Sequence, residues 1–269
     1  MYKFSINAYV RTDVGRVRSN NEDNYNLCGH IRSDVNVGVS SYKVKTFDKK
    51  ILMSVCDGMG GESLGEVASL IAVKSFNKAC CENFIITATN DVLSINRSVC
   101  EAGEKAGASR IGSTLANLYI DKGKAISCNL GDSRVYLYRK KELKRLSKDH
   151  DEATRLVDMG IISPEQAVTD KRRHSLTQFL GMFEDEIIPE PFFCDEISIE
   201  DGDRFFICSD GICDILSDED ICSILNVENM PQTAADKLIE QALEKGSKDN
   251  CTALVADIKK LHPLFYELF

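Results

Sequence analysis

The chain has 269 residues, of which 43% are hydrophobic and 28% charged, an ordinary composition for a soluble globular protein with a substantial core. Its formal net charge of -9 argues against a nucleic-acid partner, because phosphate backbones are bound by basic surfaces. No apolar run approaches the ~18 residues that span a bilayer, and residues 1–10 lack the apolar core of a secretory signal. The 11 cysteines are scattered without zinc-finger spacing, so we expect free thiols in the cytoplasm.

The first half of the chain predicts strands and helices in irregular alternation. Residues 2–10 alternate roughly and predict a strand, whereas residues 29–50 are weakly patterned and predict a surface excursion or hairpin. The continuous apolar run Ile51–Cys56 predicts a strand that is buried on both faces. Apolar residues at helical spacing then predict helices over residues 63–80 and 89–106.

The second half begins with three β-type runs, which predict an antiparallel meander: Ser113–Ile120, Lys124–Leu130 and Arg134–Tyr138. Residues 151–182 lack β patterning and predict short helical pieces around Pro164. A hairpin over residues 193–208, a helix over 234–245 and a closing strand over 251–258 complete the chain. This mixture, without regular βαβ alternation, predicts α+β layers rather than a Rossmann sheet.

Carboxylates recur at the mouths of the predicted strands, at five places along the chain: Glu22-Asp23, Asp57, Asp132, Asp210 and Asp249. Asp57 is typical, since it ends an apolar run and leads into a glycine-rich loop. One such aspartate is usually a turn residue or a cap. Several at one sheet edge would repel one another unless a cation neutralised them, and an all-oxygen set favours Mg²⁺ or Mn²⁺ over zinc.

Together these segments resemble the protein phosphatase 2C family, the metal-dependent serine/threonine protein phosphatases. The matching segments follow the family's order: VRSNNEDN (17–24), DGMGG (57–61), GST (112–114), GDSR (131–134), LSKDH (146–150), CSDG (208–211) and GSKDNCT (246–252). Each is weak alone, but seven in order between residues 11 and 258 are highly specific. The size and the methionine in DGMGG are similar to the compact bacterial members.

The resemblance implies an α-β-β-α sandwich of two antiparallel sheets flanked by antiparallel helix pairs. Residues 1–258 would form a single catalytic domain, in which residues 151–190 correspond to a variable flap beside the active site. Residues 259–269 would form a C-terminal tail. The tail is apolar, so it either packs back on the domain, which we favour, or docks a partner.

The resemblance also implies a metal centre with two ions, Mn²⁺ or Mg²⁺. Asp57 would bridge the two ions, with the Gly58 carbonyl on one of them. Asp210 and Asp249 would complete the protein ligands of the other ion. Asp132, together with Asp210, matches residues that support a third and weaker metal in bacterial relatives.

Three further residues are assigned by the same resemblance. Glu22 and Asp23 would hold metal-bound waters, mainly as outer-sphere partners. Arg18 matches the arginine that grips the substrate phosphate, a role that suits a guanidinium fork because it pairs two phosphate oxygens at once.

The implied activity is hydrolysis of phosphoserine and phosphothreonine in proteins, by a water activated at the two ions and without a phosphoenzyme. The expected partners are phosphoprotein targets of a serine/threonine kinase, and the expected protein is a cytoplasmic monomer. Met59 stands where many eukaryotic relatives have a histidine proposed as general acid, and a thioether cannot donate a proton. His150 is a poor substitute, since a polar turn residue is the simpler interpretation.

Other interpretations remain open at this point. A non-catalytic phosphoprotein-binding module of the same fold would not need the carboxylates, and a phosphatase of small phosphate esters would use the same chemistry. The motif G-x-S-x-G at residues 61–65 lacks the parallel sheet of a nucleophile elbow, and Cys128 with Arg134 lacks the helix of a C-x5-R phosphatase loop. Residues 172–174, Arg-Arg-His, either meet a phosphoprotein or form a solvated basic run.

Overall fold

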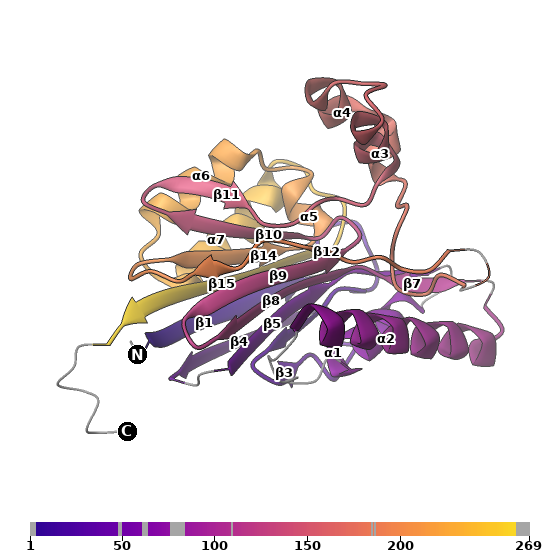
Figure 1. Ribbon diagram of the computed structural model, residues 1–269, viewed down its shortest axis with the longest axis horizontal. Helices are drawn as coiled ribbons and strands as arrows, with labels where there is room; N and C mark the ends of the chain where they lie inside the picture. Colours follow the sequence, from indigo (N-terminus) through magenta and orange to yellow (C-terminus); the bar gives the residue numbers. More distant parts are fainter. Residues whose placement is uncertain are drawn as a thin grey trace.

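The computed structural model describes residues 4–47, 50–60, 64–75, 84–108, 110–183, 185 and 187–261. Two sheets pack face to face, and helices cover the outer face of each (Figure 1). All paired strands in the two sheets are antiparallel. This arrangement confirms the predicted α+β class and the α-β-β-α sandwich.

The first sheet has six strands, in the order β11 (Glu142–Arg145), β10 (Arg134–Arg139), β14 (Arg204–Cys208), β15 (Cys251–Lys260), β1 (Phe4–Asp13) and β4 (Val39–Thr46). The second sheet runs β12 (Phe192–Phe193), β9 (Lys124–Leu130), β8 (Leu115–Asp121), β5 (Lys50–Cys56), β2 (Asn24–Leu27) and β3 (His30–Ile31), with β13 (Ile197–Ser198) also paired to β9. A short ribbon joins β6 (Gly58–Gly60) to β7 (Ile111–Ser113).

Helices close the two outer faces. The second sheet is covered by α1 (Gly65–Ser75) and α2 (Phe84–Ala106), and the first by α5 (Asp210–Cys213), α6 (Asp218–Val227) and α7 (Pro231–Glu244). The helices expected over 89–106 and 234–245 are confirmed, and α2 begins five residues earlier than expected. Residues 76–80, the end of the helix expected over 63–80, lie outside the described residues.

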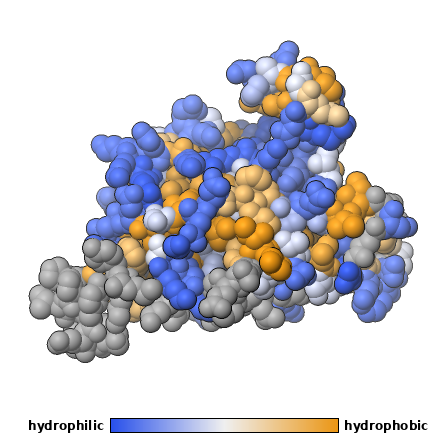
Figure 2. All heavy atoms as spheres, in the orientation of Figure 1, coloured by the Kyte–Doolittle hydropathy of each residue, from blue (hydrophilic) through white to orange (hydrophobic). Residues whose placement is uncertain are grey.

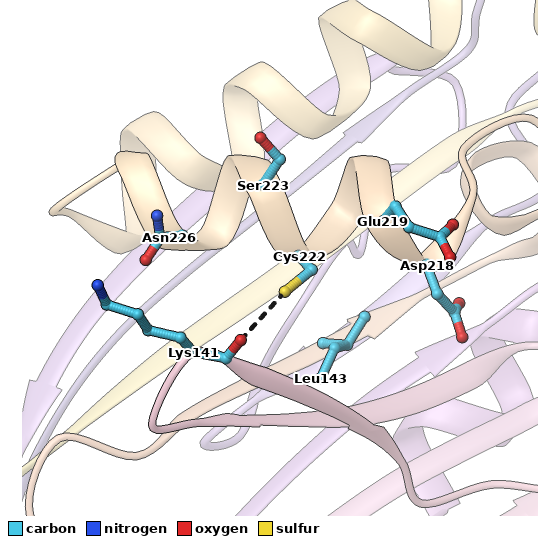
Figure 3. A pocket seen from close by; sticks show the side chains of 7 residues that line it. All are labelled: Lys141, Leu143, Asp218, Glu219, Cys222, Ser223 and Asn226. Atoms are coloured by element: carbon cyan, nitrogen blue, oxygen red, sulfur yellow. Dashed lines mark hydrogen bonds between the residues drawn. The ribbon is translucent and has the colours of Figure 1, made fainter.

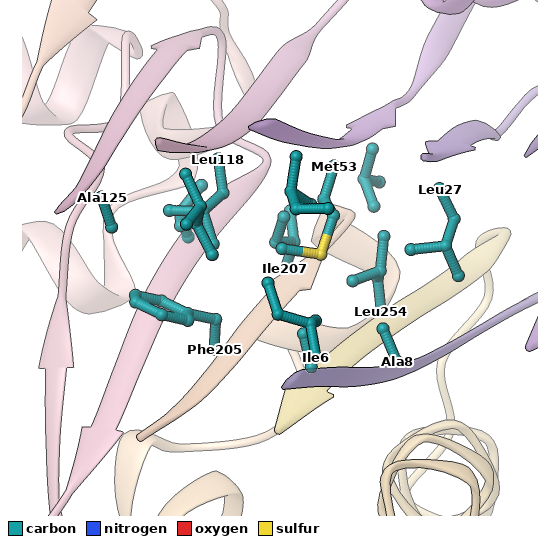
Figure 4. Packing of buried hydrophobic residues seen from close by; sticks show 14 of the residues in the cluster. Ile6, Ala8, Leu27, Met53, Leu118, Ala125, Phe205, Ile207 and Leu254 are labelled. Carbon is teal, nitrogen blue, oxygen red and sulfur yellow. The ribbon is translucent and has the colours of Figure 1, made fainter. Parts of the chain in front are cut away.

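The core between the sheets is built from every second residue of the strands. On β1, Ile6, Ala8 and Val10 face this core, whereas Tyr9 lies on the opposite face and packs under the helices that cover the first sheet. Figure 4 shows Met53 and Leu118 of the second sheet meeting Phe205 and Leu254 of the first. Each such side chain stabilises the fold by roughly 1.5–3 kcal/mol relative to its exposed state. The packed sheets thus give the strand ends fixed positions.

Two strand pairings differ from the expectation. The run Arg134–Arg139 does not continue a meander with β9, because Gly131 (φ +96°) turns the chain across to the first sheet, where β10 pairs with β14. The expected hairpin over 193–208 is also wrong, because β12 and β13 pair with β9 in the second sheet while β14 lies in the first. Both segments therefore cross between the layers.

Residues 29–50 contribute more than a surface excursion. They include β4, which pairs with β1 along eight residues and forms one edge of the first sheet. Its side chains alternate between half-buried and exposed, because an edge strand has one open face and one open margin. The weak hydrophobic pattern of this segment follows from that position.

A small unit projects from the sandwich between the two sheets and carries α3 (Glu152–Asp158), α4 (Pro164–Thr169) and the 3-10 helix η1 (Lys171–His174) (Figure 1). Ser163 caps α4 in a capping box, and Pro164 occupies its first turn. The expected short helical pieces are thereby confirmed. The tip of this unit shows apolar surface in Figure 2, where three side chains are at least 60% exposed: Met159, Ile161 and Val168.

No helix in the described part of the chain combines the length and hydropathy needed to cross a bilayer. Nine cysteines lie in the described residues and all are free thiols; Cys80 and Cys81 lie outside them. The strand β15 ends at Lys260, and residues 262–269 of the expected tail also lie outside the described residues.

Candidate metal centre

Asp57 is held by main-chain contacts where β5 ends. Its amide donates to Thr114 Oγ1 at 2.9 Å, and its carbonyl accepts from the Thr114 amide at 2.8 Å. The Thr114 hydroxyl in turn lies 2.7 Å from the hydroxyl of Ser133, next to Asp132. The backbone of Asp57 is therefore fixed on two sides, as expected for a strand end that positions a functional carboxylate.

Gly58 permits a close approach of three segments. A Cβ at this position would lie 2.1 Å from the Gly65 carbonyl oxygen and 2.7 Å from that of Glu22. The Gly58 amide donates to the Glu22 carbonyl at 3.2 Å. The glycine thus lets the segment that carries Glu22 and the start of α1 lie directly against the loop after Asp57.

Asp210 and Asp249 lie at the same end of the first sheet. Asp210 begins α5 directly after β14, and Asp249 precedes β15, the neighbouring strand. A Cβ on Gly211 would lie 2.0 Å from the Asn250 carbonyl oxygen, so only glycine allows these two segments to meet. The sheet register and this contact together bring both aspartates to one place.

Four of the predicted carboxylates influence one another strongly. Burial, followed by Asp23, Asp210 and Asp249, raises the pKa of Asp57 well above its usual value. Burial and then Asp249 raise the pKa of Asp210 to about 7. Burial likewise raises the pKa of Asp23 to about 6, opposed by hydrogen bonds from Thr252 and Ser209. The structure therefore gathers acids from four separate segments into one poorly solvated cluster.

Asp132 and Glu22 lie at the margins of this cluster. Burial, then Asp210 and Asp214, raise the pKa of Asp132 well above its usual value, which places Asp132 on the Asp210 side. Burial raises the pKa of Glu22, and its foremost acidic neighbour is Glu66. The structure thus brings both residues to the site without placing either at its centre.

The donor set fits a hard divalent cation. The Oδ1 atoms of Asp23 and Asp210 are buried, and neither has a hydrogen-bond partner within the described residues. Buried carboxylate oxygens without partners are costly, and a cation bound by oxygen ligands removes that cost. Within the same part of the chain, no group of three or more His, Cys, Asp or Glu side chains is already placed to hold an ion. Mg²⁺ retains several waters in proteins, so water would complete the ligands of an ion held here.

Arg18 reaches the cluster from an exposed loop. Its Nη2 donates to Asp249 Oδ2 at 2.7 Å, and this hydrogen bond raises the pKa of Arg18. The Arg18 side chain remains 53% exposed. The structure therefore places the predicted phosphate-binding arginine beside the acids, where it is paired with a predicted metal ligand.

Neither Met59 nor His150 is arranged to donate a proton to the leaving group. Met59 lies in β6, opposite Gly112 of β7. His150 Nδ1 accepts a hydrogen bond from the Gly131 amide at 3.1 Å, and burial, then Lys148, lower the His150 pKa to about 4. A neutral imidazole that accepts a main-chain hydrogen bond supports the turn before Asp132, in agreement with the simpler interpretation.

Two hydroxyl residues at the site were not singled out from the sequence. Ser209 Oγ and Thr252 Oγ1 both donate to Asp23 Oδ2, at 2.7 and 2.6 Å. Both lie inside segments that carry the family resemblance, CSDG and GSKDNCT. Nothing in the sequence distinguishes them from ordinary buried hydroxyls, so only the fold reveals their common partner.

The projecting unit borders the acid cluster through a hollow of about 640 Å³ that is lined by Asp132, Arg134, Asp214 and residues of α3 and α4. Arg173 forms an ion pair with Asp214, and His174 Nδ1 lies 3.2 Å from the same carboxylate. Arg172 pairs with Asp170 at 2.6 Å. The basic run is therefore neither free nor simply solvated, since it anchors the projecting unit to α5 and caps its own turn.

A second hollow, of about 480 Å³, lies between α6 and the turn after β10 (Figure 3). Cys222 Sγ faces it and donates to the Lys141 carbonyl at 3.6 Å. None of the site residues predicted from the sequence lines this hollow.

Of the two competing motifs, the C-x5-R motif does not form a site. Cys128 is fully buried, and Arg134 opens a strand and pairs with Asp149 at 2.7 Å, so no C-x5-R loop exists. In the G-x-S-x-G motif, Ser63 and the two residues before it lie outside the described residues.

The sandwich and the acid cluster define a known class of phosphatase. The chain belongs to the protein phosphatase 2C family, whose family model, described as "Protein phosphatase 2C", matches residues 8–251. Its relatives are serine/threonine protein phosphatases, and this chain is an enzyme of the same kind, acting on phosphoproteins.

Individual relatives cover nearly all of the chain. The serine/threonine phosphatase stp of Listeria welshimeri is 30% identical over 261 residues, which is 94% of this chain and 96% of that protein. PstP of Mycobacterium tuberculosis is 32% identical over 93% of this chain but 44% of its own length. A solved structure of that phosphatase superposes with a TM-score of 0.78 at 30% identity, covering 94% of this chain and 99% of the other. The catalytic domain of PstP in complex with two manganese ions gives a TM-score of 0.74 at 29% identity, over 95% and 99% of the two chains.

Proposed function

We propose that this enzyme hydrolyses phosphoserine and phosphothreonine at a centre of two divalent cations, Mn²⁺ or Mg²⁺. The buried cluster around Asp57 and Asp210 carries the proposal, because its acids raise one another's pKa and two of its oxygens have no partner among the described residues. One structural neighbour, the catalytic domain of PstP, was solved in complex with two manganese ions, which supports the same number for this chain. When bound, such ions supply Lewis-acid activation of water at neutral pH and offset charge on the phosphate.

Four residues would hold the ions. Asp57 would be shared by both, since Asp23, Asp210 and Asp249 all act on its pKa. The Gly58 carbonyl would complete the protein ligands of one ion. Asp210 and Asp249 would complete those of the other. Asp132 is proposed to serve a third and weaker ion with Asp210, its first acidic neighbour.

Arg18 is proposed to grip the substrate phosphate with its guanidinium fork. Its present partner is Asp249, a proposed ligand, at 2.7 Å. If Asp249 held a cation, its attraction for Arg18 would be weaker, which would leave the guanidinium available to pair with the phosphate. Arg18 would then offset the charge that develops on the non-bridging oxygens during in-line attack.

Glu22 and Asp23 are proposed to orient water at the rim of the centre by accepting hydrogen bonds from it. Proton donation to the leaving alkoxide is not assigned to His150, whose pKa of about 4 leaves it neutral at pH 7. Met59 has no proton to give. The proton is therefore proposed to come from water within the centre.

The surroundings favour a protein substrate. We propose that residues 1–258 act as one catalytic domain in which the projecting unit serves as a flap beside the centre. Its exposed apolar tip, Met159, Ile161 and Val168, suits contact with a protein surface rather than with a small ester. Targets of a serine/threonine kinase are the proposed substrates.

The test compares two substrates with and without metal. After chelation and dialysis, the full chain should hydrolyse p-nitrophenyl phosphate only when Mn²⁺ or Mg²⁺ is restored. Phosphoserine and phosphothreonine peptides should be turned over with a higher kcat/KM than p-nitrophenyl phosphate. Turnover that survives chelation would contradict the metal centre, and an equal or higher kcat/KM for the small ester would favour a phosphatase of small phosphate esters.

A further inference from the structure

Asp23 is fully buried where three segments of the centre meet. Its Oδ2 accepts hydrogen bonds from Ser209 Oγ at 2.7 Å and from Thr252 Oγ1 at 2.6 Å. Ser209 directly precedes Asp210, and Thr252 lies on β15 just after Asp249. One carboxylate oxygen therefore joins the segment of Glu22 and Asp23 to the two segments that carry the proposed ligands of one ion.

Both hydroxyl protons can reach the carboxylate. Ser209 Oγ accepts from the Thr252 amide at 3.0 Å, which leaves its single proton for Asp23. Thr252 Oγ1 has two acceptors within reach of its single proton, Thr12 Oγ1 at 2.7 Å and Asp23 Oδ2 at 2.6 Å. An ionised carboxylate is the stronger acceptor of the two, which favours the hydrogen bond to Asp23.

The hydrogen-bond network extends through Thr12 to Asn21. Thr12 Oγ1 accepts from Asn21 Nδ2 at 2.9 Å, and Asn21 Oδ1 accepts from the Asp23 amide at 3.1 Å. The network therefore leads from the Asp23 carboxylate through Thr252, Thr12 and Asn21 back to the Asp23 main chain. Hydrogen bonds in such a network polarise one another in a site of low dielectric, and together they hold the carboxylate in one orientation.

The hydrogen bonds from Ser209 and Thr252 both reach the same oxygen of Asp23, Oδ2. The other, Oδ1, is buried without a hydrogen-bond partner among the described residues. The nearby Arg32 guanidinium donates to the main-chain carbonyls of Asn21 and Asp23, at 2.6 and 2.7 Å. The carboxylate is thus saturated on one side and open on the side of Oδ1.

We propose that Ser209 and Thr252 are positioning residues, whose hydroxyls hold Asp23 through Oδ2 and so keep Oδ1 available to accept a hydrogen bond from water at the divalent cations. This inference rests on the proposed metal centre. The two hydroxyls touch neither substrate nor cation and act through Asp23. Loss of such an outer partner typically weakens metal affinity by ~10–100-fold.

The test uses variants that delete one hydroxyl at a time in the full chain. Thr252→Val keeps the shape of the side chain and removes its donor, Ser209→Ala removes the other donor, and Thr252→Ser retains a hydroxyl. Ser127→Ala is the matched control, since Ser127, on β9 of the second sheet, is equally buried but donates to the Leu146 carbonyl. The Mn²⁺ dissociation constant is measured from the electron paramagnetic resonance signal of free Mn²⁺, alongside the Tm of the metal-free proteins.

We expect Thr252→Val and Ser209→Ala to raise the Mn²⁺ dissociation constant by about 10-fold or more, and Thr252→Ser to stay within about 3-fold of the wild type. Ser127→Ala should bind Mn²⁺ as the wild type does, whatever its Tm. Excess Mn²⁺ should restore kcat in the two hydroxyl deletions, because the proposed ligands of the ions remain. If Thr252→Val does not fold, Ser209→Ala carries the test.

Unchanged Mn²⁺ affinity in both deletions, with a loss of Tm alone, would overturn the inference and leave the hydroxyls with a structural role. The proposed function would survive that result. A wild-type chain that binds no Mn²⁺ would instead overturn the metal centre and, with it, this inference.

Discussion

Asp57 and Asp210 belong to one buried cluster, although Asp57 follows β5 of the second sheet and Asp210 follows β14 of the first. Burial and neighbouring acids raise the pKa of both carboxyls, which disfavours their ionised forms when no cation is bound. A bound cation would favour the ionised carboxyls, which couples metal affinity to pH. This pair therefore marks the place where the two sheets create the site.

Asp210→Asn should separate catalysis from stability. The substitution keeps the shape of the side chain but removes a ligand charge, so kcat/KM with Mn²⁺ should fall by more than about 100-fold, beyond the loss seen for outer partners. The metal-free Tm should not fall, because repulsion with Asp249 is removed. Asp158→Asn, at an exposed ion pair with Lys148, is the control. Full activity of Asp210→Asn with metal present would contradict the assignment.

Arg18→Ala should weaken turnover without weakening metal binding. Loss of a charged, forked hydrogen bond to phosphate costs about 1.5–3 kcal/mol, which is a fall in kcat/KM of roughly 10- to 100-fold. Arg18→Lys keeps the charge without the fork, so its kcat/KM should lie between those of the wild type and Arg18→Ala. Arg16→Ala, on the same exposed loop, should have no effect. An unchanged rate for Arg18→Ala would remove the arginine from the site.

Gly58→Ala should destabilise the fold, because the new Cβ would lie 2.1 Å from the Gly65 carbonyl oxygen, a main-chain atom that cannot move alone. Overpacking costs roughly 1–3 kcal/mol, and backbone contact places this variant at the upper end of that range. Gly38→Ala is the control, since its nearest neighbour is a Val14 methyl at 3.3 Å. Urea unfolding of the two variants gives the comparison, and equal stabilities would contradict the close approach.

His150 should make the stability depend on pH. Its folded pKa of about 4 lies below the unfolded value of 6.5, so the unfolded chain binds the extra proton. Stability from the neutral imidazole is therefore fully present above pH 6.5 and is lost as pH falls from 6.5 to about 4, by at most about 3 kcal/mol.

His150→Asn keeps an acceptor for the Gly131 amide but cannot titrate in this range. Comparing its unfolding free energy with that of the wild type from pH 7 to pH 4 cancels the contribution of the carboxylates that both share. The difference between the two proteins should shift in favour of His150→Asn by a few kcal/mol as the pH falls, on the scale of about 1.4 kcal/mol per pKa unit. A difference that is independent of pH would contradict the partly buried, neutral state of His150.

Strand positions were predictable from the sequence, whereas strand partners were only partly so. The apolar runs that form β5, β8, β9, β14 and β15 were predicted correctly, because a buried strand needs apolar residues whichever strand it pairs with. The hydrophobic pattern does not indicate which sheet a strand joins. The crossing at Gly131 and the separation of β12 and β13 from β14 therefore became visible only in three dimensions.

The site was predictable to a different degree. Aspartates at strand ends such as Asp57 and Asp210 carry a local signal, an apolar run followed by acid and glycine. The hydroxyls of Ser209 and Thr252 have no such signal, because their role depends on a partner, Asp23, that is distant in the sequence. The pairing of Arg18 with Asp249 was hidden for the same reason.

The most direct test is the number of Mn²⁺ ions that the full chain binds. Calorimetric titration of the chelated and dialysed protein should show two ions per chain at neutral pH, and Asp57→Asn should lose at least the tighter of them. Absence of Mn²⁺ binding to the wild type, or unchanged stoichiometry and affinity in Asp57→Asn, would contradict the assignment of Asp57 as the bridging ligand.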